Sequence, residues 1–165
     1  QRALARSRRK CPRPTRAVHV GLMTDLGTGL VAVDTAVFIY FIEENPQFAP
    51  LIDPLFREAD QGARELVTSA LTLLEVLVVP YRAGDRALAD RYEALLTRSR
   101  GIRLVDLTRD HVRAAAQLRA TTGVKTPDAL QLAAALGTNC KTFLTNDRRL
   151  PTIPGLQIRQ LASYL

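Results

Sequence analysis

Residues 30–42 read LVAVDTAVFIYFI, and this stretch decides the fold. Leu30–Val33 is apolar at every position, which predicts a strand that is buried on both faces. A helix is expected to begin at Thr35 and to end before Asn45–Pro46, because proline restricts the preceding residue to extended backbone. Asp34 lies between the two elements and carries the only charge of the stretch. The order of strand, acid and helix predicts a carboxylate at the edge of a parallel sheet.

The remaining sequence continues this alternation of short apolar strands and longer helices. Because strands separated by helices need crossover connections, the pattern predicts a parallel sheet. We expect one three-layer α/β/α domain with four or five strands, in which a ligand would bind at the carboxyl ends of the strands. Further strands are expected at 66–68, 102–105, 142–144 and 156–158, and helices at 35–44, 48–62, 70–82, 86–99, 108–123 and from 126 onward.

The formal net charge of +7 is concentrated near the start of the chain. Residues 1–22 hold seven of the 23 basic residues and no acid, so 16 basic and 16 acidic residues remain beyond them. The charge therefore indicates no basic binding face on the body of the protein. Met23 is the only methionine, and residues 1–22 are either a native basic arm or sequence upstream of the natural start. We expect a basic extension over 1–27, disordered or non-native, and a folded domain over 28–165.

Several classes of protein are excluded by the sequence. The longest apolar run contains Asp34 and is too short to span a bilayer, so no membrane association is expected. Cys11 and Cys140 have neither disulfide nor metal-ligand spacing, which fits a protein of the reducing cytoplasm. The sequence has no phosphate-binding glycine loop, no dinucleotide-binding glycine motif and no G-x-S-x-G motif. No nucleophilic side chain is evident, so any chemistry has to come from other groups.

Three aspartates lie where the predicted topology could bring them to one edge of the sheet. Asp34 directly follows the first strand, Asp147 follows the strand at 142–144, and Asp128 opens a helix. Each has an ordinary alternative role. Asp34 could cap the next helix, Asp128 is favoured by the helix dipole, and Asp147 could belong to a turn.

Glu75 is the fourth acid of interest, because it interrupts the apolar run from Leu71 to Val79. A helix that is apolar on nearly every side is expected to be buried. A lone buried carboxylate is costly unless it binds a metal or pairs with a cation. The alternative to a metal is a salt bridge to an arginine such as Arg82 or Arg109.

The four acids together are more informative than any one of them. Two carboxylates about 4 Å apart repel by roughly 4 kcal/mol at an effective dielectric near 20, so a cluster of four needs a cation or raised pKa values. Carboxylate oxygens with water are the ligands of Mg²⁺ or Mn²⁺, whereas zinc is disfavoured without histidine. Such a cation activates water and offsets charge on phosphate, which favours phosphodiester hydrolysis. Lys125, Arg148 and Arg149 flank two of the acids and are candidate phosphate contacts, or else solvated surface charges.

Four segments, in this order, resemble the PIN-domain ribonucleases, and most of all the VapC toxins of type II toxin–antitoxin systems. The resemblance covers about 28–165 and implies a metal-dependent endoribonuclease that uses Asp34, Glu75, Asp128 and Asp147. It also implies that Thr35 and Thr145 orient the acids or water, and that Asn146 is a polar neighbour of Asp147. One departure is Arg148–Arg149, near which the family often has an apolar residue. The segments are VAVDTAVFIYFIE, TSALTLLEVLVVPYRAGD, VKTPDALQLAAAL and FLTNDRRLPTIPGLQIRQL.

The resemblance further implies an antitoxin protein that lays a peptide along the acidic groove, an RNA substrate and a homodimer. Two other functions stay open: a non-catalytic scaffold of the same fold that binds a partner, and a DNA-directed nuclease of a related fold. A phosphatase with Asp34 as nucleophile is disfavoured, because that chemistry wants a second aspartate at position 36, where this chain has alanine.

Overall fold

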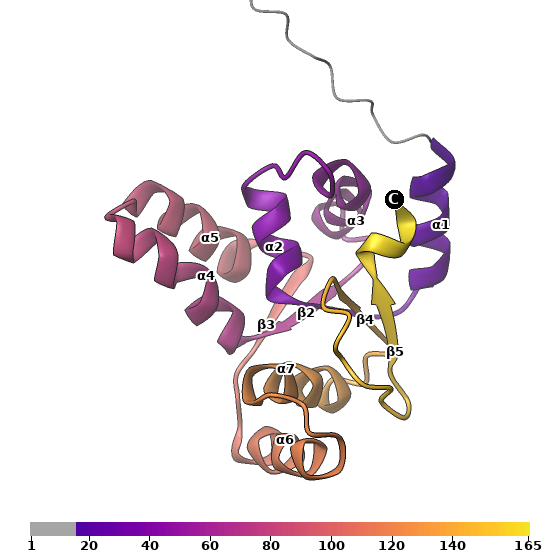
Figure 1. The fold of residues 1–165 in the computed structure, drawn as a ribbon. Helices are drawn as coiled ribbons and strands as arrows, with labels where there is room; N and C mark the ends of the chain where they lie inside the picture. Colours follow the sequence, from indigo (N-terminus) through magenta and orange to yellow (C-terminus); the bar gives the residue numbers. More distant parts are fainter. Residues whose placement is uncertain (1–15) are drawn as a thin grey trace, which may run out of the picture.

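The computed structural model describes residues 16–165, with side chains from residue 21 onward. In this part of the chain five strands form one sheet in the order β3-β2-β1-β4-β5, and every neighbouring pair is parallel (Figure 1). The predicted parallel α/β sheet is therefore confirmed, with five strands. The strands are β1 (Val31–Val33), β2 (Leu66–Ser69), β3 (Ile102–Val105), β4 (Thr142–Thr145) and β5 (Gln157–Gln160).

Helices cover both faces of the sheet, which gives the three expected layers (Figure 1). α1, α2 and α3 lie on one face, α6 and α7 lie on the other, and the α4–α5 hairpin extends to the side of the sheet. Within the described residues, no helix combines the length and the apolar character needed to cross a membrane. The helices are α1 (Arg16–Leu26), α2 (Thr35–Ile42), α3 (Ala49–Asp60), α4 (Ala70–Ala83), α5 (Arg86–Arg98), α6 (Arg109–Thr122), α7 (Thr126–Gly137) and the 3-10 helix η1 (Leu161–Tyr164).

Two apolar clusters, one on each face of the sheet, form the core. Side chains alternate along each strand, so Val31 and Val33 enter one cluster while Ala32 enters the other. In β4, Phe143 and Leu144 divide in the same way. This explains why the strands are apolar at successive positions, as expected of a sheet covered on both faces.

The first described helix lies in a segment for which the sequence predicts only a basic extension. Residues 16–26, inside the expected extension 1–27, form α1. Leu22 and Leu26 of this helix are buried in the cluster that also contains α3 side chains. The packed part of the chain thus begins before residue 28; residues 1–15 lie outside the described residues. Among the side chains of α1 that the structure describes, from residue 21 onward, only Leu22 and Leu26 are buried.

The helix that carries Glu75 is less buried than its composition predicts. Thr72 and Val76 of α4 are buried, but Leu74, Val79 and Tyr81 are each at least 60% exposed. The expectation of a buried helix is therefore wrong for one face of α4. The cause is the hairpin geometry, since α4 packs mainly on α5 and extends past the sheet (Figure 1). The result is an exposed apolar face formed by Leu74, Val78 and Tyr81, with Val79 exposed to one side of it.

A close backbone contact at Gly101 joins the turn before β3 to the end of α3. A Cβ added there would lie 2.1 Å from the carbonyl oxygen of Ala59, and Gly101 O already accepts from the N–H of Leu66 at 2.7 Å. Gly101→Ala is expected to destabilise the fold by about 1–3 kcal/mol, because backbone has to move to admit the methyl group. A thermal melt should show Tm at least about 3 °C lower.

Gly29→Ala is the matched control, because nothing lies within 4 Å of a Cβ built there. Its Tm should stay close to that of the wild-type protein. An unchanged Tm for Gly101→Ala would show that the contact between the turn and α3 is not as tight as described.

Candidate functional site

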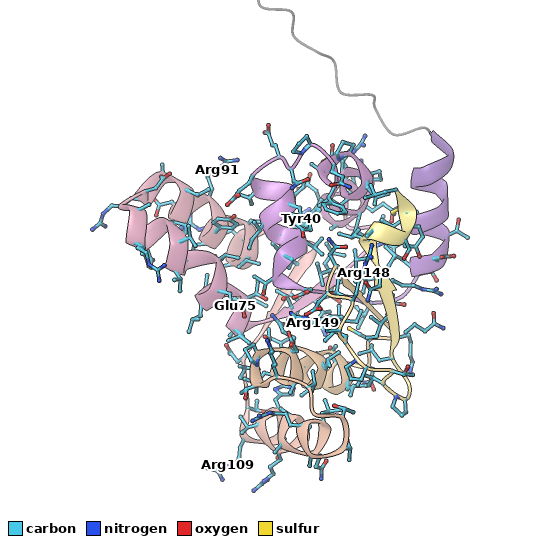
Figure 2. All side chains as sticks on the ribbon, viewed as in Figure 1. Tyr40, Glu75, Arg91, Arg109, Arg148 and Arg149 are labelled. Atoms are coloured by element: carbon cyan, nitrogen blue, oxygen red, sulfur yellow. The ribbon has the colours of Figure 1, made fainter. Side chains whose placement is uncertain are left out.

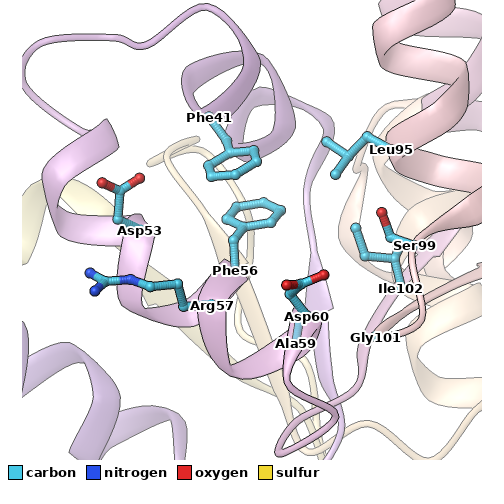
Figure 3. Close-up of a pocket in the computed structure, with 10 residues that line it drawn as sticks. All are labelled: Phe41, Asp53, Phe56, Arg57, Ala59, Asp60, Leu95, Ser99, Gly101 and Ile102. Carbon is cyan, nitrogen blue, oxygen red and sulfur yellow. The ribbon is translucent and has the colours of Figure 1, made fainter.

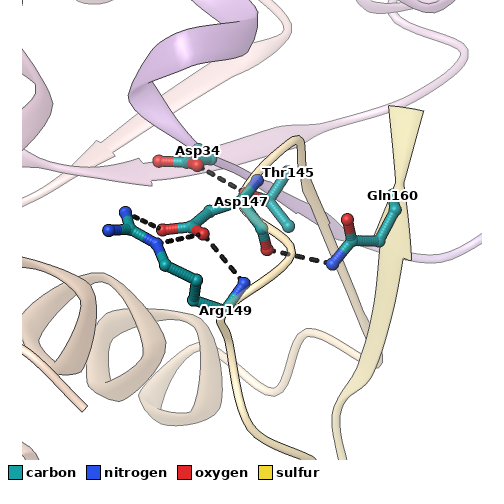
Figure 4. Close-up of polar contacts among 5 residues, drawn as sticks. All are labelled: Asp34, Thr145, Asp147, Arg149 and Gln160. Atoms are coloured by element: carbon teal, nitrogen blue, oxygen red, sulfur yellow. Dashed lines mark hydrogen bonds and ion pairs between the residues drawn. The ribbon is translucent and has the colours of Figure 1, made fainter. Parts of the chain in front are cut away.

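Asp34 lies directly after β1 and precedes the first turn of α2. Its side chain makes no capping hydrogen bond to α2, so the ordinary alternative of a helix cap does not apply. Instead its Oδ2 accepts a hydrogen bond of 2.6 Å from the hydroxyl of Thr145, at the end of β4 (Figure 4). Burial raises the pKa of the Asp34 carboxyl, and the charges of Asp128 and Glu75 raise it further. The carboxylate is thus placed where a cation would stabilise its ionised form.

Glu75 lies on α4, five residues after its first residue, and its side chain is half-buried. Its Oε2 accepts a hydrogen bond from the hydroxyl of Thr35, the first residue of α2. No ion pair joins Glu75 to Arg82 or Arg109 among the described residues, so the salt-bridge alternative does not hold here. Thr35, which was expected to orient the acids or water, therefore contacts one of the acids directly.

Asp128 lies in the first turn of α7, and its carboxylate is half-buried. Burial raises its pKa, and the charge of Asp147 adds to the rise, while Arg149 and Lys125 oppose it. The dipole of α7 favours a negative charge in the first turn, but it does not keep the pKa of Asp128 at its ordinary value. The direction of the shift identifies Asp128 as a second acid that lacks a sufficient counter-charge.

Asp147 differs from the other acids because an arginine already neutralises it. Arg149 donates to it from Nε at 2.9 Å and from Nη2 at 2.7 Å, and the backbone N–H of Arg149 donates at 2.9 Å (Figure 4). These contacts lower the pKa of Asp147 to about 2. The amide of Gln160 also holds the carbonyl of Asp147, at 2.9 Å. Asp147 is therefore a well-held acid whose carboxylate is engaged by Arg149 in this structure.

The other candidate residues of the segment after β4 behave in different ways. Asn146 donates to the hydroxyl of Tyr40 at 3.3 Å and accepts from the backbone of Ala162 at 3.2 Å, so it ties this segment to α2 and η1. Figure 2 shows Glu75 near the start of α4 and Arg149 between α7 and β4, with Arg148 close by. Arg148 and Lys125 are exposed, as phosphate contacts would be.

A buried polar network beneath the acids was not foreseen from the sequence. It contains Gln131 of α7, which contacts Ser69, Thr35 and Thr72. Thr68 extends the network through a contact with Thr72. A usable signal was present, because Gln131 is the only polar residue in the apolar helical run ALQLAAAL.

Whether the acids fit a divalent cation can be judged from their donors and charges. Every candidate ligand is a carboxylate oxygen, which suits Mg²⁺ or Mn²⁺. Among the described residues, no three acidic, histidine or cysteine side chains converge closely enough to enclose one ion. Mg²⁺ usually keeps several waters and takes only one or two carboxylates, so a hydrated ion fits this arrangement. Burial and neighbouring carboxylates raise the pKa values of Asp34 and Asp128, so a nearby cation would favour the ionised form of both.

A surface pocket lies elsewhere in the molecule and does not define the site. It has a volume of about 400 Å³ and lies between α3, α5 and the start of β3 (Figure 3). Phe41 and Phe56 form part of its wall, with ring centroids 3.9 Å apart. None of the four acids lines it. The candidate site is therefore identified by its uncompensated charges, and not by this cavity.

Fold and site together define a class of α/β domain with an acidic site at the carboxyl edge of a parallel sheet. The particular family is shown by a sequence comparison, in which the PIN domain matches residues 31–156. The chain belongs to the PIN-domain family. This confirms the resemblance predicted from the four sequence segments. A search of curated protein sequences finds no match to this chain.

Solved structures of toxin–antitoxin complexes contain chains with a similar fold. VapBC2 from Rickettsia felis, bound to a promoter DNA fragment, has a chain with a TM-score of 0.60 and 16% identity, covering 79% of this chain and 98% of that one. A chain of a toxin–antitoxin complex from Klebsiella pneumoniae has a TM-score of 0.58 and 20% identity, and the match covers 76% of this chain and 94% of that one. A chain of DNA-bound VapBC from Salmonella typhimurium has a TM-score of 0.58 and 21% identity, and the match covers 81% of this chain and 98% of that one. At these identities the likeness extends to the fold alone.

Proposed function

We propose that this PIN domain is a Mg²⁺- or Mn²⁺-dependent endoribonuclease that acts as the toxin of a toxin–antitoxin pair. The observation that carries the proposal is that the charges of Glu75 and Asp128, two acids from distant segments of the chain, both act on the carboxyl of Asp34. A bound divalent cation would supply an activated water and offset charge on the scissile phosphate. The four acids would surround a hydrated ion, one or two of them as direct ligands and the rest through its waters, with Asp147 acting in either way.

The residues of the chain would then have separate tasks. Thr145 fixes one oxygen of Asp34 and leaves the other free of that bond. Thr35 does the same for Glu75. Fixing one oxygen of each acid reduces the freedom that would be lost when an ion binds, which is how neighbours of metal ligands raise affinity. We assign no covalent intermediate to the chain, because no nucleophilic side chain is needed for hydrolysis by water.

Arg149 is the best-placed candidate for a contact with an RNA phosphate. It is 74% exposed, yet it already lies against Asp147 at 2.7 Å. Arg149→Gln is expected to weaken RNA binding about three- to tenfold and to lower the slope of log affinity against log salt by about 1, because one phosphate contact is lost. Fluorescence anisotropy with labelled single-stranded RNA at several salt concentrations measures both quantities.

Arg109→Gln is the control for this measurement, because Arg109 lies at the start of α6, away from Arg149 (Figure 2). It removes the same charge from an exposed position and should leave affinity nearly unchanged. Equal losses for the two variants would mean that RNA responds to overall charge and has no specific contact with Arg149.

A protein partner is part of the proposal. The structural neighbours include complexes named VapBC and toxin–antitoxin, and the exposed apolar face of α4 is a surface that a partner protein could cover. We therefore propose a cognate antitoxin, and a homodimer as the state of the free toxin. Co-expression with any small reading frame found beside the gene, followed by light scattering of the purified complex and of the free protein, tests both.

A non-catalytic scaffold is the second candidate, and the exposed apolar face of α4 is the observation in its favour. A scaffold has no use for uncompensated carboxylates, so it predicts no response to divalent cations. The proposed nuclease is tested by incubating the purified protein with RNA and with DNA in Mn²⁺, and by sequencing RNA ends after brief induction in cells, with Asp34→Asn as the control. Cleavage of DNA but not RNA would support the DNA-directed alternative.

A further inference from the structure

The side-chain amide of Gln131 connects three elements beneath the acidic site. Gln131 is 5% exposed and lies one turn after Asp128 on α7. Its Oε1 accepts from the hydroxyl of Ser69 at 2.9 Å and from the backbone N–H of Ser69 at 3.3 Å. Its Nε2 donates to Thr72 at 2.6 Å and to Thr35 at 3.1 Å. All the hydrogen-bonding capacity of the amide is thereby used inside the protein.

The backbone of Ser69 determines which way this amide points. A backbone N–H can only donate, so the atom that faces it has to be the carbonyl oxygen of Gln131. The flipped amide would place two donors against each other. The amino group of Gln131 is therefore fixed toward the hydroxyls of Thr35 and Thr72.

The fixed amide in turn determines the direction of the Thr35 hydroxyl. The amino group of Gln131 can only donate, so Thr35 Oγ1 accepts from it and keeps its single hydrogen for another partner. Glu75 Oε2 is a carboxylate oxygen within reach, and a hydrogen bond to a charged acceptor is stronger than one to a neutral hydroxyl. The hydrogen of Thr35 is thus directed at Glu75.

We propose that Gln131 is a positioning residue of the acidic site, which acts through the Thr35 hydroxyl to hold one oxygen of Glu75 in a fixed place. This inference rests on the proposed function, because it assigns Gln131 to the same site. Gln131 touches none of the four acids by a hydrogen bond, so its effect has to pass through Thr35. Thr35 and Gln131 should therefore act as one unit, although 96 positions separate them.

A double-mutant cycle tests this dependence. Thr35→Val removes the hydroxyl, and Gln131→Met removes the amide while keeping a side chain of similar length. Each single variant is expected to lower the single-turnover rate of RNA cleavage, and the affinity for Mn²⁺, about 10- to 100-fold, as is typical of residues that orient metal ligands. The double variant should lose no more than about threefold beyond the worse single variant.

Further measurements separate positioning from mere stability. Thr68→Val removes a similarly buried hydroxyl of the same network, which makes its hydrogen bond to Thr72 and not to Glu75, and it should stay within about threefold of the wild-type rate. The loss in Gln131→Met should appear in the rate at saturating RNA, with RNA affinity unchanged, because Gln131 is buried. Thermal melts confirm that each variant is folded at the assay temperature.

Gln131→Glu is the second variant in case Gln131→Met does not fold. Its carboxyl has a similar shape and still accepts from Ser69, but it can donate at most one hydrogen where the amide donates two, so losses in the same direction are expected.

The outcomes are distinct. The inference is overturned if the two single losses multiply in the double variant, or if folded Gln131 variants cleave RNA and bind Mn²⁺ like the wild-type protein. Mn²⁺ affinity is read from the paramagnetic resonance of the free ion, so it does not depend on catalysis. A wild-type protein that binds Mn²⁺ but cleaves no RNA would refute the proposed function alone. The Mn²⁺ affinities of the two single variants and the double variant would still decide the role of Gln131.

Discussion

Asp34→Asn is expected to lower RNA cleavage at least about 1,000-fold while the protein stays folded. Removal of a metal ligand forfeits several kcal/mol of charge stabilisation in the transition state, and each 1.36 kcal/mol corresponds to a factor of ten. The amide can still accept the hydrogen bond that Thr145 donates at 2.6 Å, so the local geometry has no reason to change. The loss would therefore report the charge of Asp34 and not its packing.

The same variant is expected to be at least as stable as the wild-type protein in metal-free buffer. Burial raises the pKa of Asp34 in the fold, so near pH 7 the ionised carboxylate opposes folding, and this cost disappears as the pH falls below the ordinary pKa. A neutral amide removes the cost at every pH. Thermal melts near pH 7 in a chelator check this, and a lower Tm for the variant would contradict it.

Asp53→Asn is the matched control for activity, because Asp53 is an exposed acid at the distant cavity (Figure 3). It makes the same chemical change outside the acidic site and should cleave RNA at the wild-type rate. Wild-type cleavage by folded Asp34→Asn would remove Asp34 from the proposed machinery.

Removal of divalent cations is expected to abolish RNA cleavage, and Mg²⁺ or Mn²⁺ should restore it. The acids are expected to attract a cation, because burial and neighbouring carboxylates raise the pKa values of Asp34 and Asp128, and a cation would stabilise the ionised form of both. An ion that binds only the folded state stabilises it by about 2.7 kcal/mol at a hundredfold excess over Kd. For a chain of this size that corresponds to a rise in Tm of roughly 5–10 °C.

Two comparisons give this prediction its specificity. The rise in Tm with Mn²⁺ should be nearly lost in Asp34→Asn and retained in Asp53→Asn. Full cleavage in a strong chelator, after dialysis that removes bound metal, would show that the acids work without an ion. A flat Tm in Mn²⁺ together with no cleavage would favour the scaffold.

The site itself was only partly predictable from sequence. Asp34, Asp128 and Asp147 were found because strand ends and helix starts are local features, and in a parallel sheet these positions meet at one edge. The engagement of Asp147 by Arg149 was not foreseen, although the two are close in sequence, because turn geometry decides whether the guanidinium folds back. The exposed face of α4 was also not foreseen, since apolar composition does not tell which side of a helix has a neighbour.

By itself, the sequence determined the parallel α/β fold and the position of its strands, because alternation, helix breaks and apolar runs act over a few residues; the four acids remain its prediction for the site. The tertiary structure alone decided that Thr145 supports Asp34 across 111 positions, that Thr35 supports Glu75 across 40, and that Gln131 joins Thr35 across 96. Hydrogen bonds are directional and short, so their partners follow from how helices pack on the sheet, and no local pattern records that packing.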